Sequence, residues 1–409
     1  MSHTEHAAPV TESQRMQTLD VVRGFALLGI LVPNIVAFAW PSSAMAFPEE
    51  MNGGGAWNEA GHAITGVFTL GKMMALFSML FGAGVVIYGR KFDDDGNGNR
   101  PPLRRGALLW YRRIAWLLVI GLGHAVFLWF GDILVWYAMA ALLAVWWVRR
   151  IDARWQIGIG LGLHLVSTVI LLGFSALGVW AVGAGHAGED ELMGNTALEL
   201  SAYTGGYLDT FKARIPSLLM FWFLLGPMFT PGITGLMMMG MGLLRLGILS
   251  GERPTRFYAV MTILGLVGGL GLTLTLMLGI GEVWPDWAGF IWQSCSQFVG
   301  IPISLGYMGL LIWLVRLGVA RPLTGALAAV GRMALSNYLL QTILCTTFFY
   351  GYGLGYFATI DYPGLFAVIA GVWAVNIVFS KAWLSAFRFG PAEWLWRSLT
   401  YWELQPMRR

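Results

Sequence analysis

Two titratable residues near the end of one apolar run have the types and spacing for proton chemistry. His124 is surrounded by apolar residues, and Asp132 follows it eight residues later. Histidine changes charge near neutral pH and is the usual proton carrier in proteins, while a nearby carboxylate can orient its ring. We predict that His124 acts as a general base and that Asp132 orients it. The alternative is a structural histidine that bonds to a neighbouring helix.

Polar residues also follow one face of the first apolar run. Asp20 and Arg23 are three residues apart, and Arg23 and Asn34 are eleven residues apart. Eleven residues correspond to about three turns of an α-helix, so Arg23 and Asn34 share a face. Pro33 loosens the helix beside Asn34 by removing a backbone donor. This pattern predicts a shared polar pathway; the alternative is a snorkelling arginine and an asparagine that packs against another helix.

Two basic residues and one amide complete the candidate set. Lys72 stands inside an apolar run, where it needs a carboxylate, a carbonyl or water as a partner, and Asp132 and Glu59 are the carboxylates that the sequence offers. Arg332 stands at the inner end of a later run, where it could meet an anionic ligand that enters from the cytoplasm. Asn337 follows in the same run, and amide bonds between helices would explain it without any chemistry.

The elements that position these residues are membrane helices. Of the 409 residues, 57% are hydrophobic and 12% charged, and the mean hydropathy is +0.65. A soluble domain is about 25% charged, so the composition excludes a soluble enzyme, a disordered chain and a coiled coil. We predict an all-α polytopic membrane protein with about ten transmembrane helices in one bundle, because about 20 apolar residues span a bilayer. The runs are 21–40, 66–88, 107–130, 133–148, 157–182, 218–244, 257–280, 290–314, 327–349 and 365–387.

The basic residues orient these runs. Arginine and lysine gather in alternate connections, which the positive-inside rule assigns to the cytoplasm. The sequence therefore predicts a membrane protein with both termini cytoplasmic. Its parts are a cytoplasmic tail at 1–16, a ten-helix domain at 17–387 with an outer loop at about 183–216, and a cytoplasmic interfacial segment at 388–409. The outer loop is a lid or a plain connector, and a connector is favoured.

Several other site classes lack support. Cys295 and Cys345 fall in apolar runs and suggest no disulfide framework, and no metal is expected. The acidic segment at 93–98 imitates a calcium loop, but Arg104 stands where that loop needs glutamate. No basic cluster is interleaved with aromatic residues, so nucleic acid is not an expected partner. Membrane lipids are, and Gly-x-x-x-Gly faces at 158–162 and 265–269 are compatible with a homodimer.

Five segments resemble conserved blocks of the YeiB-like family of bacterial membrane proteins. They are LDVVRGFALLGILVPNI from Leu19, GKMMALFSMLFGAG from Gly71, GHAVFLWFGDIL from Gly123, GRMALSNYLLQTILCTTFFYGYGLG from Gly331 and FRFGPAEWLWRSLTY from Phe387. The resemblance covers almost the whole chain, and its last two blocks lie in a C-terminal region known as a domain of unknown function. It implies a location in the bacterial inner membrane.

That family in turn resembles the transmembrane acyltransferases, which include heparan-α-glucosaminide N-acetyltransferase. The link is an L-D-x-x-R-G block followed by an asparagine, present here as Asp20, Arg23, Gly24 and Asn34. The resemblance implies that acyl-CoA enters from the cytoplasm and that an acyl group reaches an acceptor on the far side, with a histidine as base. The lysosomal enzyme has this histidine in the loop after its first span, where the present sequence offers only His62.

The resemblance also implies roles for the candidate residues. His124 is the preferred base, acyl-CoA (acetyl-CoA) is the expected co-substrate, and a cofactor-binding group of Asp20, Arg23, Arg332 and Asn337 would hold it. Arginine suits bidentate contact with phosphate. Asn34 and Lys72 would line the acyl path or polarise the thioester carbonyl. The alternative is a proton-coupled transporter or flippase of a small molecule or lipid, in which His124, Asp132 and Lys72 relay protons.

Overall fold

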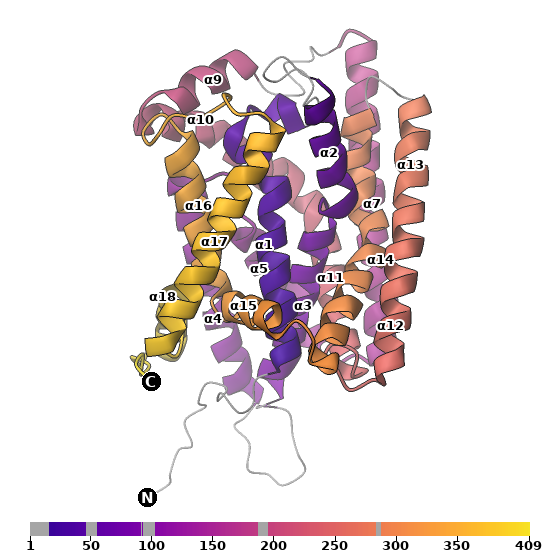
Figure 1. Ribbon diagram of the computed structural model, residues 1–409, viewed down its shortest axis with the longest axis vertical. Helices are drawn as coiled ribbons and strands as arrows, with labels where there is room; N and C mark the ends of the chain where they lie inside the picture. The colour runs from indigo at the N-terminus through magenta and orange to yellow at the C-terminus, as the bar shows by residue number, and fades with distance from the viewer. Residues whose placement is uncertain (1–15, 46–54, 91, 93–102, 187–194, 284–287) are drawn as a thin grey trace, which may run out of the picture.

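The chain folds into an upright bundle of helices (Figure 1). The computed structural model describes residues 16–45, 55–90, 92, 103–186, 195–283 and 288–409. The predicted tail up to residue 15, the acidic segment at 93–98 and part of the predicted outer loop lie outside the described residues. Every regular element within the described ranges is helical, so the prediction of an all-α fold is confirmed there.

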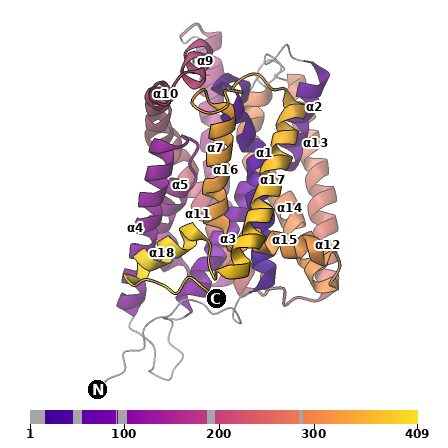
Figure 2. The ribbon, with the colours of Figure 1, turned by 60° about the vertical axis from the view of Figure 1, so that its left-hand side comes forward.

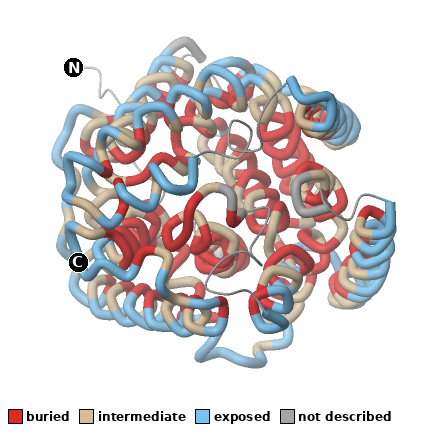
Figure 3. Tube along the Cα trace, turned by 90° about the horizontal axis from the view of Figure 1, so that it is seen from above, coloured by how far each residue is buried: buried red, intermediate tan, exposed pale blue. Residues whose placement is uncertain are grey.

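Eight helical stretches among the described residues, some of them made of consecutive helices, are long and apolar enough to cross a membrane. They are Gln17–Ala39, Ala56–Gly89, Arg105–Phe127, Ala153–Gly183, Tyr207–Arg245, Thr255–Val283, Ile291–Leu317 and Tyr362–Ala386. Their outward faces are apolar: Leu165, Val169, Ile263 and Leu278 are 46%, 58%, 57% and 70% exposed. Figure 3 shows the buried residues gathered in the middle of the bundle and the exposed ones around its rim. Apolar side chains on the outside of a bundle are typical of a protein surrounded by lipid.

The elements follow the predicted runs, with several interruptions. The α-helices are α1 (Gln17–Ala39), α2 (Ala56–Phe68), α3 (Lys72–Gly89), α4 (Leu103–Phe127), α5 (Leu134–Ala140), α6 (Trp146–Val148), α7 (Ala153–Gly183), α9 (Thr196–Thr204), α10 (Tyr207–Leu219), α11 (Gly226–Arg245), α12 (Thr255–Ile263), α13 (Gly269–Val283), α14 (Ala288–Leu317), α15 (Arg321–Arg332), α16 (Ala334–Phe349), α17 (Tyr362–Ala386) and α18 (Pro391–Tyr401). A 3₁₀ turn covers Ser42–Met45, and π-helical segments cover Ala141–Val145, Met220–Leu225 and Leu264–Gly268.

Two of the predicted runs are broken. The run at 66–88 is interrupted between α2 and α3, where Gly71 has a φ of +76° that favours glycine. The run at 327–349 is interrupted at Met333, which lies between α15 and α16 with a φ of −117°. Figure 1 shows α15 lying across the bundle near its lower end, while α16 stands upright. Only α16 therefore follows the direction of the bundle in this run.

The crossing of α1 and α15 is a close backbone contact. A Cβ atom added at Gly24 would meet the carbonyl group of Leu327, and one added at Gly331 would meet the carbonyl group of Asp20. Glycine at both positions lets the helices touch, as small residues do in membrane proteins. This contact brings Arg23 and Arg332, the neighbours of the two glycines, to the same end of the bundle.

The two ends of the bundle differ in their connections. The beginning of α1, α15, α18 and the C-terminus lie at the lower end, and α9 and α10 lie at the upper end (Figures 1 and 2). The hydroxyl of Tyr207 in α10 donates to Phe127 O at 2.9 Å, and Arg214 Nη1 donates to Val126 O at 2.8 Å. Two carbonyls in the last turn of α4 are thereby satisfied by α10.

Candidate functional site

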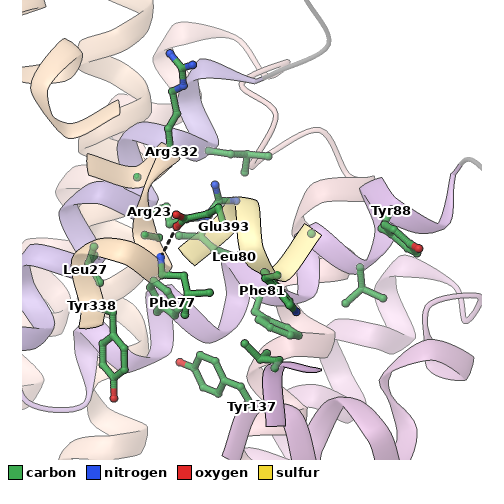
Figure 4. A pocket seen from close by; sticks show the side chains of 18 of the residues that line it. Arg23, Leu27, Phe77, Leu80, Phe81, Tyr88, Tyr137, Arg332, Tyr338 and Glu393 are labelled. Carbon is green, nitrogen blue, oxygen red and sulfur yellow. Dashed lines mark hydrogen bonds between the residues drawn. The ribbon is translucent and has the colours of Figure 1, made fainter. Parts of the chain in front are cut away.

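A cavity of about 310 Å³ is walled by α1, α3, α4, α5, α15, α16 and α18. Figure 4 shows its two ends. Arg332, Arg23 and Glu393 gather at one end, Phe77, Leu80 and Phe81 follow, and Tyr338 and Tyr137 lie at the other. The cavity therefore has a charged end and an aromatic end.

The charged end is rich in arginine. Four arginines and two carboxylates line the cavity, which gives a formal net charge of +2. Arg23 Nη1 donates to Asp20 Oδ1 at 2.8 Å, so these two predicted residues form an ion pair. The guanidinium of Arg113 lies 3.6 Å from the ring centroid of Trp396 in α18. The four arginines are Arg23, Arg113, Arg332 and Arg397.

Arg397 is a buried arginine that keeps its positive charge. Burial is the first cause that lowers the pKa of Arg397 to about 10, and the positive charge of Arg113 is the second. A group with that pKa remains a cation at neutral pH. Arg397 therefore adds a permanent positive charge to the cavity.

Glu393 joins α18 to the beginning of α16. Its carboxylate accepts hydrogen bonds from Leu335 N at 2.7 Å, Ser336 N at 3.2 Å and Ser336 Oγ at 2.5 Å. Unpaired N–H groups at a helix N-terminus attract a negative charge. Burial raises the pKa of Glu393, and the hydrogen bonds from Ser336 and Leu335 oppose this rise. One acidic residue of α18 thus caps a distant helix and faces the cavity.

At the aromatic end, the rings pack on one another. Phe77 and Tyr137 are stacked with centroids 5.8 Å apart, and Phe81 lies 5.6 Å from Tyr137. The hydroxyl of Tyr137 is held by Ser78 Oγ at 2.9 Å. The rings give this end of the cavity an apolar wall.

His124 and Asp132 form a hydrogen-bonded pair just beyond this wall. His124 Nδ1 lies 2.6 Å from Asp132 Oδ2, and each side chain is 1% exposed. The hydroxyl of Tyr338 lies 3.5 Å from the same carboxylate oxygen, and the rings of Tyr338 and His124 are 5.0 Å apart. Tyr338 lines the cavity and contacts the pair, so it stands between them.

The pair is extended by a residue that the sequence analysis did not identify. His124 Nε2 lies 2.9 Å from Thr342 Oγ1, and Asp132 Oδ1 accepts from Val135 N at 2.7 Å. Thr342 is 218 residues away from His124 and stands in an ordinary apolar helix. Only the packing of α16 against α4 reveals it.

Lys72 lies away from the cavity, and the carboxylate partners that the sequence offered for it are wrong. Its Nζ atom donates to Gly66 O at 2.8 Å and lies 5.6 Å from the centroid of the Trp292 ring. The interruption after α2 explains this partner, since the last carbonyls of a helix lack intrahelical donors. A backbone carbonyl thus replaces Asp132 and Glu59.

Neither asparagine of the candidate set lines the cavity. Asn34 is half-buried further along α1. Asn337 is fully buried: its Nδ2 donates to Ser380 Oγ at 2.7 Å, and its Oδ1 accepts from Asn376 Nδ2 at 3.1 Å. These bonds tie α16 to α17 and match the structural alternative that the sequence left open. His62 also lies outside the cavity, with its ring 6.5 Å from that of Tyr362.

Among the described residues, no group of three or more His, Cys, Asp or Glu side chains is arranged to hold a metal ion. Of the eight candidate residues, the structure places Asp20, Arg23 and Arg332 on the cavity wall. It joins His124 to Asp132 behind Tyr338, and it leaves Asn34, Lys72 and Asn337 elsewhere.

Comparisons with known proteins find one family model and several similar chains. Residues 243–403 match the model of a family described as a protein of unknown function (DUF418). The chain is 32% identical to the uncharacterized protein YeiB of Escherichia coli, over 95% of this chain and 96% of YeiB. It is 29% identical to the uncharacterized protein YxaH of Bacillus subtilis, over 98% of both chains. No solved structure matches the chain.

Proposed function

The chain belongs to the YeiB-like family, and we propose that it is a membrane-embedded acyltransferase that takes an acyl group from cytoplasmic acyl-CoA. The acceptor is an envelope component or a small molecule. One observation carries the proposal: a single cavity has arginines at one end and, at the other, a tyrosine that contacts a buried histidine–aspartate pair. Acyl-CoA has the matching polarity, with phosphates at one end and a thioester on a slender arm at the other.

The size of the cavity supports a bound arm rather than a whole bound cofactor. Ligand pockets for small molecules usually measure about 300–1,000 Å³, and this cavity of about 310 Å³ is at the lower limit. The pantetheine arm would lie along Phe77 and Phe81. The phosphates would lie at the arginine end, where guanidinium groups form two parallel hydrogen bonds to phosphate oxygens.

The paired residues supply the proton transfer. Asp132 accepts from Val135 N and faces His124 Nδ1, so the Nδ1 atom carries the proton and the Nε2 atom, which faces Thr342 Oγ1, is unprotonated and can act as a base. His124 would remove the proton from the attacking hydroxyl or amine and return it to the departing CoA thiolate. The hydroxyl of Tyr338 would move aside to admit the thioester. No role in this reaction falls to Lys72, Asn34 or Asn337, because none of them lines the cavity.

The orientation follows from the same arginines. We place the protein in the inner membrane with ten spans, counting the shorter upright helices, and with both termini in the cytoplasm. The arginine end of the cavity lies at the lower end of the bundle, together with the beginning of α1 and the C-terminus (Figure 1). Positive residues gather on the cytoplasmic side of membrane proteins, which supports this orientation. It also directs the charged end of the cavity toward cytoplasmic CoA.

The direct test is acetyl transfer by the purified protein in nanodiscs. Acetyl-CoA labelled in its acetyl group is supplied with an extract of envelope acceptors, and free CoA and labelled acceptor are measured. We expect both products from the natural protein and from the control His186→Gln, whose histidine is exposed. We expect neither from His124→Gln. If the natural protein neither binds acetyl-CoA nor releases CoA, the enzyme proposal fails.

A second candidate is proton-coupled transport, and the burial of the pair favours it. Both side chains are 1% exposed, as expected for a relay that carries protons between two sides of a membrane. In liposomes with a pH gradient, a transporter would move protons together with a small molecule, and His124→Gln would block both movements. Acetyl-CoA would then have no effect on the protein. These results would replace the enzyme proposal with the transport proposal.

A further inference from the structure

Thr342 completes a hydrogen-bonded row of three side chains. Asp132 Oδ2 faces His124 Nδ1 at 2.6 Å, and His124 Nε2 faces Thr342 Oγ1 at 2.9 Å. A hydroxyl, a base and a group that orients the base are the three parts of an activated nucleophile. We propose that Thr342 is a nucleophile that carries the acyl group as a covalent ester; this inference rests on the proposed function.

The direction of each hydrogen bond supports the assignment. Asp132 Oδ1 accepts from Val135 N at 2.7 Å, so the carboxylate acts as an acceptor and takes the Nδ1 proton of His124 on its other oxygen. The Nε2 lone pair then faces Thr342, whose hydroxyl must donate to it. The competing acceptor of Thr342, the backbone oxygen of Tyr338, lies further away at 3.4 Å. The shorter contact to His124 is the stronger one.

The surroundings protect an ester at this position. The side chains of His124 and Asp132 are 1% exposed, and Thr342 itself is 1% exposed. Water is the main competitor of an acceptor for an acyl-enzyme, and a buried site excludes it. An ester on Thr342 would therefore be protected from hydrolysis until the acceptor binds.

The reaction that we infer has two balanced half-reactions. Thr342 Oγ attacks the thioester carbonyl while His124 Nε2 takes the hydroxyl proton, the C–S bond breaks, and the CoA thiolate leaves with that proton as a thiol. The product is an ester on Thr342. An acceptor hydroxyl or amine then attacks the ester carbonyl, His124 takes the acceptor proton and returns it to Thr342 Oγ, and the C–O bond to Thr342 breaks.

The position of Thr342 in the fold indicates what a covalent step would achieve. The helix α16 begins beside Glu393 at the arginine end of the cavity, so Thr342, four residues after Tyr338, stands one turn further from that end. The cavity residue Tyr338 lies on one side of the row, and the aromatic cluster around Trp129 and Phe349 lies at the other end of the bundle. An ester on Thr342 allows CoA to leave toward the cytoplasm before the acceptor arrives from the opposite side.

The test is to trap the ester. Full-length protein in nanodiscs is mixed with acetyl-CoA without acceptor, quenched in acid, digested and analysed by mass spectrometry, while released CoA is counted. We expect one acetyl group on Thr342 and a burst of about one CoA per protein. Thr342→Val, which keeps the shape and removes the hydroxyl, should lose the adduct and reduce turnover at least about 10³-fold. Thr342→Ser should retain the adduct.

A matched control separates chemistry from packing. Thr346 stands one turn further on α16 and is 2% exposed. Its hydroxyl donates to Ile343 O at 3.3 Å and is hydrogen-bonded to Tyr352, so Thr346→Val should keep both the adduct and the burst. Turnover by Thr342→Val at the natural rate, or an acetyl group found on His124 instead, would overturn the covalent step and leave the proposed function standing with direct transfer. If the natural protein binds no acetyl-CoA, the proposed function and this inference fail together.

Discussion

The hydroxyl of Tyr338 lies 3.5 Å from Asp132 Oδ2, and the ring of the same tyrosine lines the arginine-rich cavity. Tyr338 also accepts a hydrogen bond from Ile133 N at 3.2 Å, which fixes its hydroxyl beside the carboxylate. One side chain thus separates a charged, ligand-sized space from a buried histidine–aspartate pair. The charged end of the cavity and the proton-transfer pair form one site only if Tyr338 moves.

Removing the ring of Tyr338 should expose His124. In Tyr338→Ala the cavity would extend to the pair, and we expect diethyl pyrocarbonate to modify His124 about tenfold faster than in the natural protein, as measured by mass spectrometry of the histidine peptides. Tyr338→Phe keeps the ring and should leave His124 protected. Equal protection of His124 in the alanine variant would show that Tyr338 is not the barrier.

Each cavity arginine should contribute to binding of acetyl-CoA. Arg332→Gln and Arg397→Gln each remove a cation from the cavity wall and should weaken binding about 10- to 100-fold, since a hydrogen bond to a charged group contributes about 1.5–3 kcal/mol. The measurement is equilibrium binding by isothermal calorimetry. Arg256→Gln, at an exposed arginine of α12, is the control and should bind normally. Natural affinity in both cavity variants would show that the CoA phosphates do not bind at the arginine end of the cavity.

The carboxyl of Glu393 should make thermal stability depend on pH. Burial raises the pKa of Glu393, so the folded protein binds this proton more tightly than the unfolded chain. The resulting stabilisation is fully present below the ordinary glutamate pKa and is lost as the pH rises through the raised value. The melting temperature of the natural protein should therefore fall with rising pH relative to that of Glu393→Gln. Parallel curves would contradict the raised pKa; Glu403→Gln, at an exposed position, is the control.

Asn337 should affect stability and leave substrate binding unchanged. Asn337→Leu strands the buried partners Ser380 and Asn376, and an unsatisfied buried group costs about 1–3 kcal/mol. We expect a lower melting temperature in detergent and a natural KM for acetyl-CoA. Asn34→Leu, at a half-buried position outside this network, should cost less. A raised KM in Asn337→Leu without a loss of stability would restore the ligand role that the sequence suggested.

Periodicity and hydropathy predicted the helical architecture well, because apolar stretches of sufficient length have few other options in lipid. The same patterns could not locate interruptions. Hydropathy does not distinguish residues 66–70 from residues 72–88, because both segments belong to one apolar run. The break between them depends on the positive φ of Gly71. Likewise, α15 lies across the bundle because Gly24 and Gly331 allow it to contact α1, a long-range fit that a local pattern does not reveal.

The candidate site was only partly predictable for the same reason. Asp20 with Arg23 and His124 with Asp132 are near in sequence, and proximity along the chain indicated both pairs. Thr342, Glu393 and Arg397 join the site through packing of distant helices. Lys72 shows the opposite case: burial of a charge indicated function, yet a carbonyl and an indole ring satisfy it.

In the proposed complex, the cavity holds acyl-CoA with its acyl end against Tyr338. An acyl-CoA that carries a photoreactive diazirine at the end of its acyl chain tests this arrangement in one measurement. After irradiation of the purified protein, mass spectrometry should find the label on Tyr338, Ile133 or Tyr137, and excess acetyl-CoA should remove it. Label on the outward faces of α7 or α13, or label that acetyl-CoA does not displace, would contradict the account.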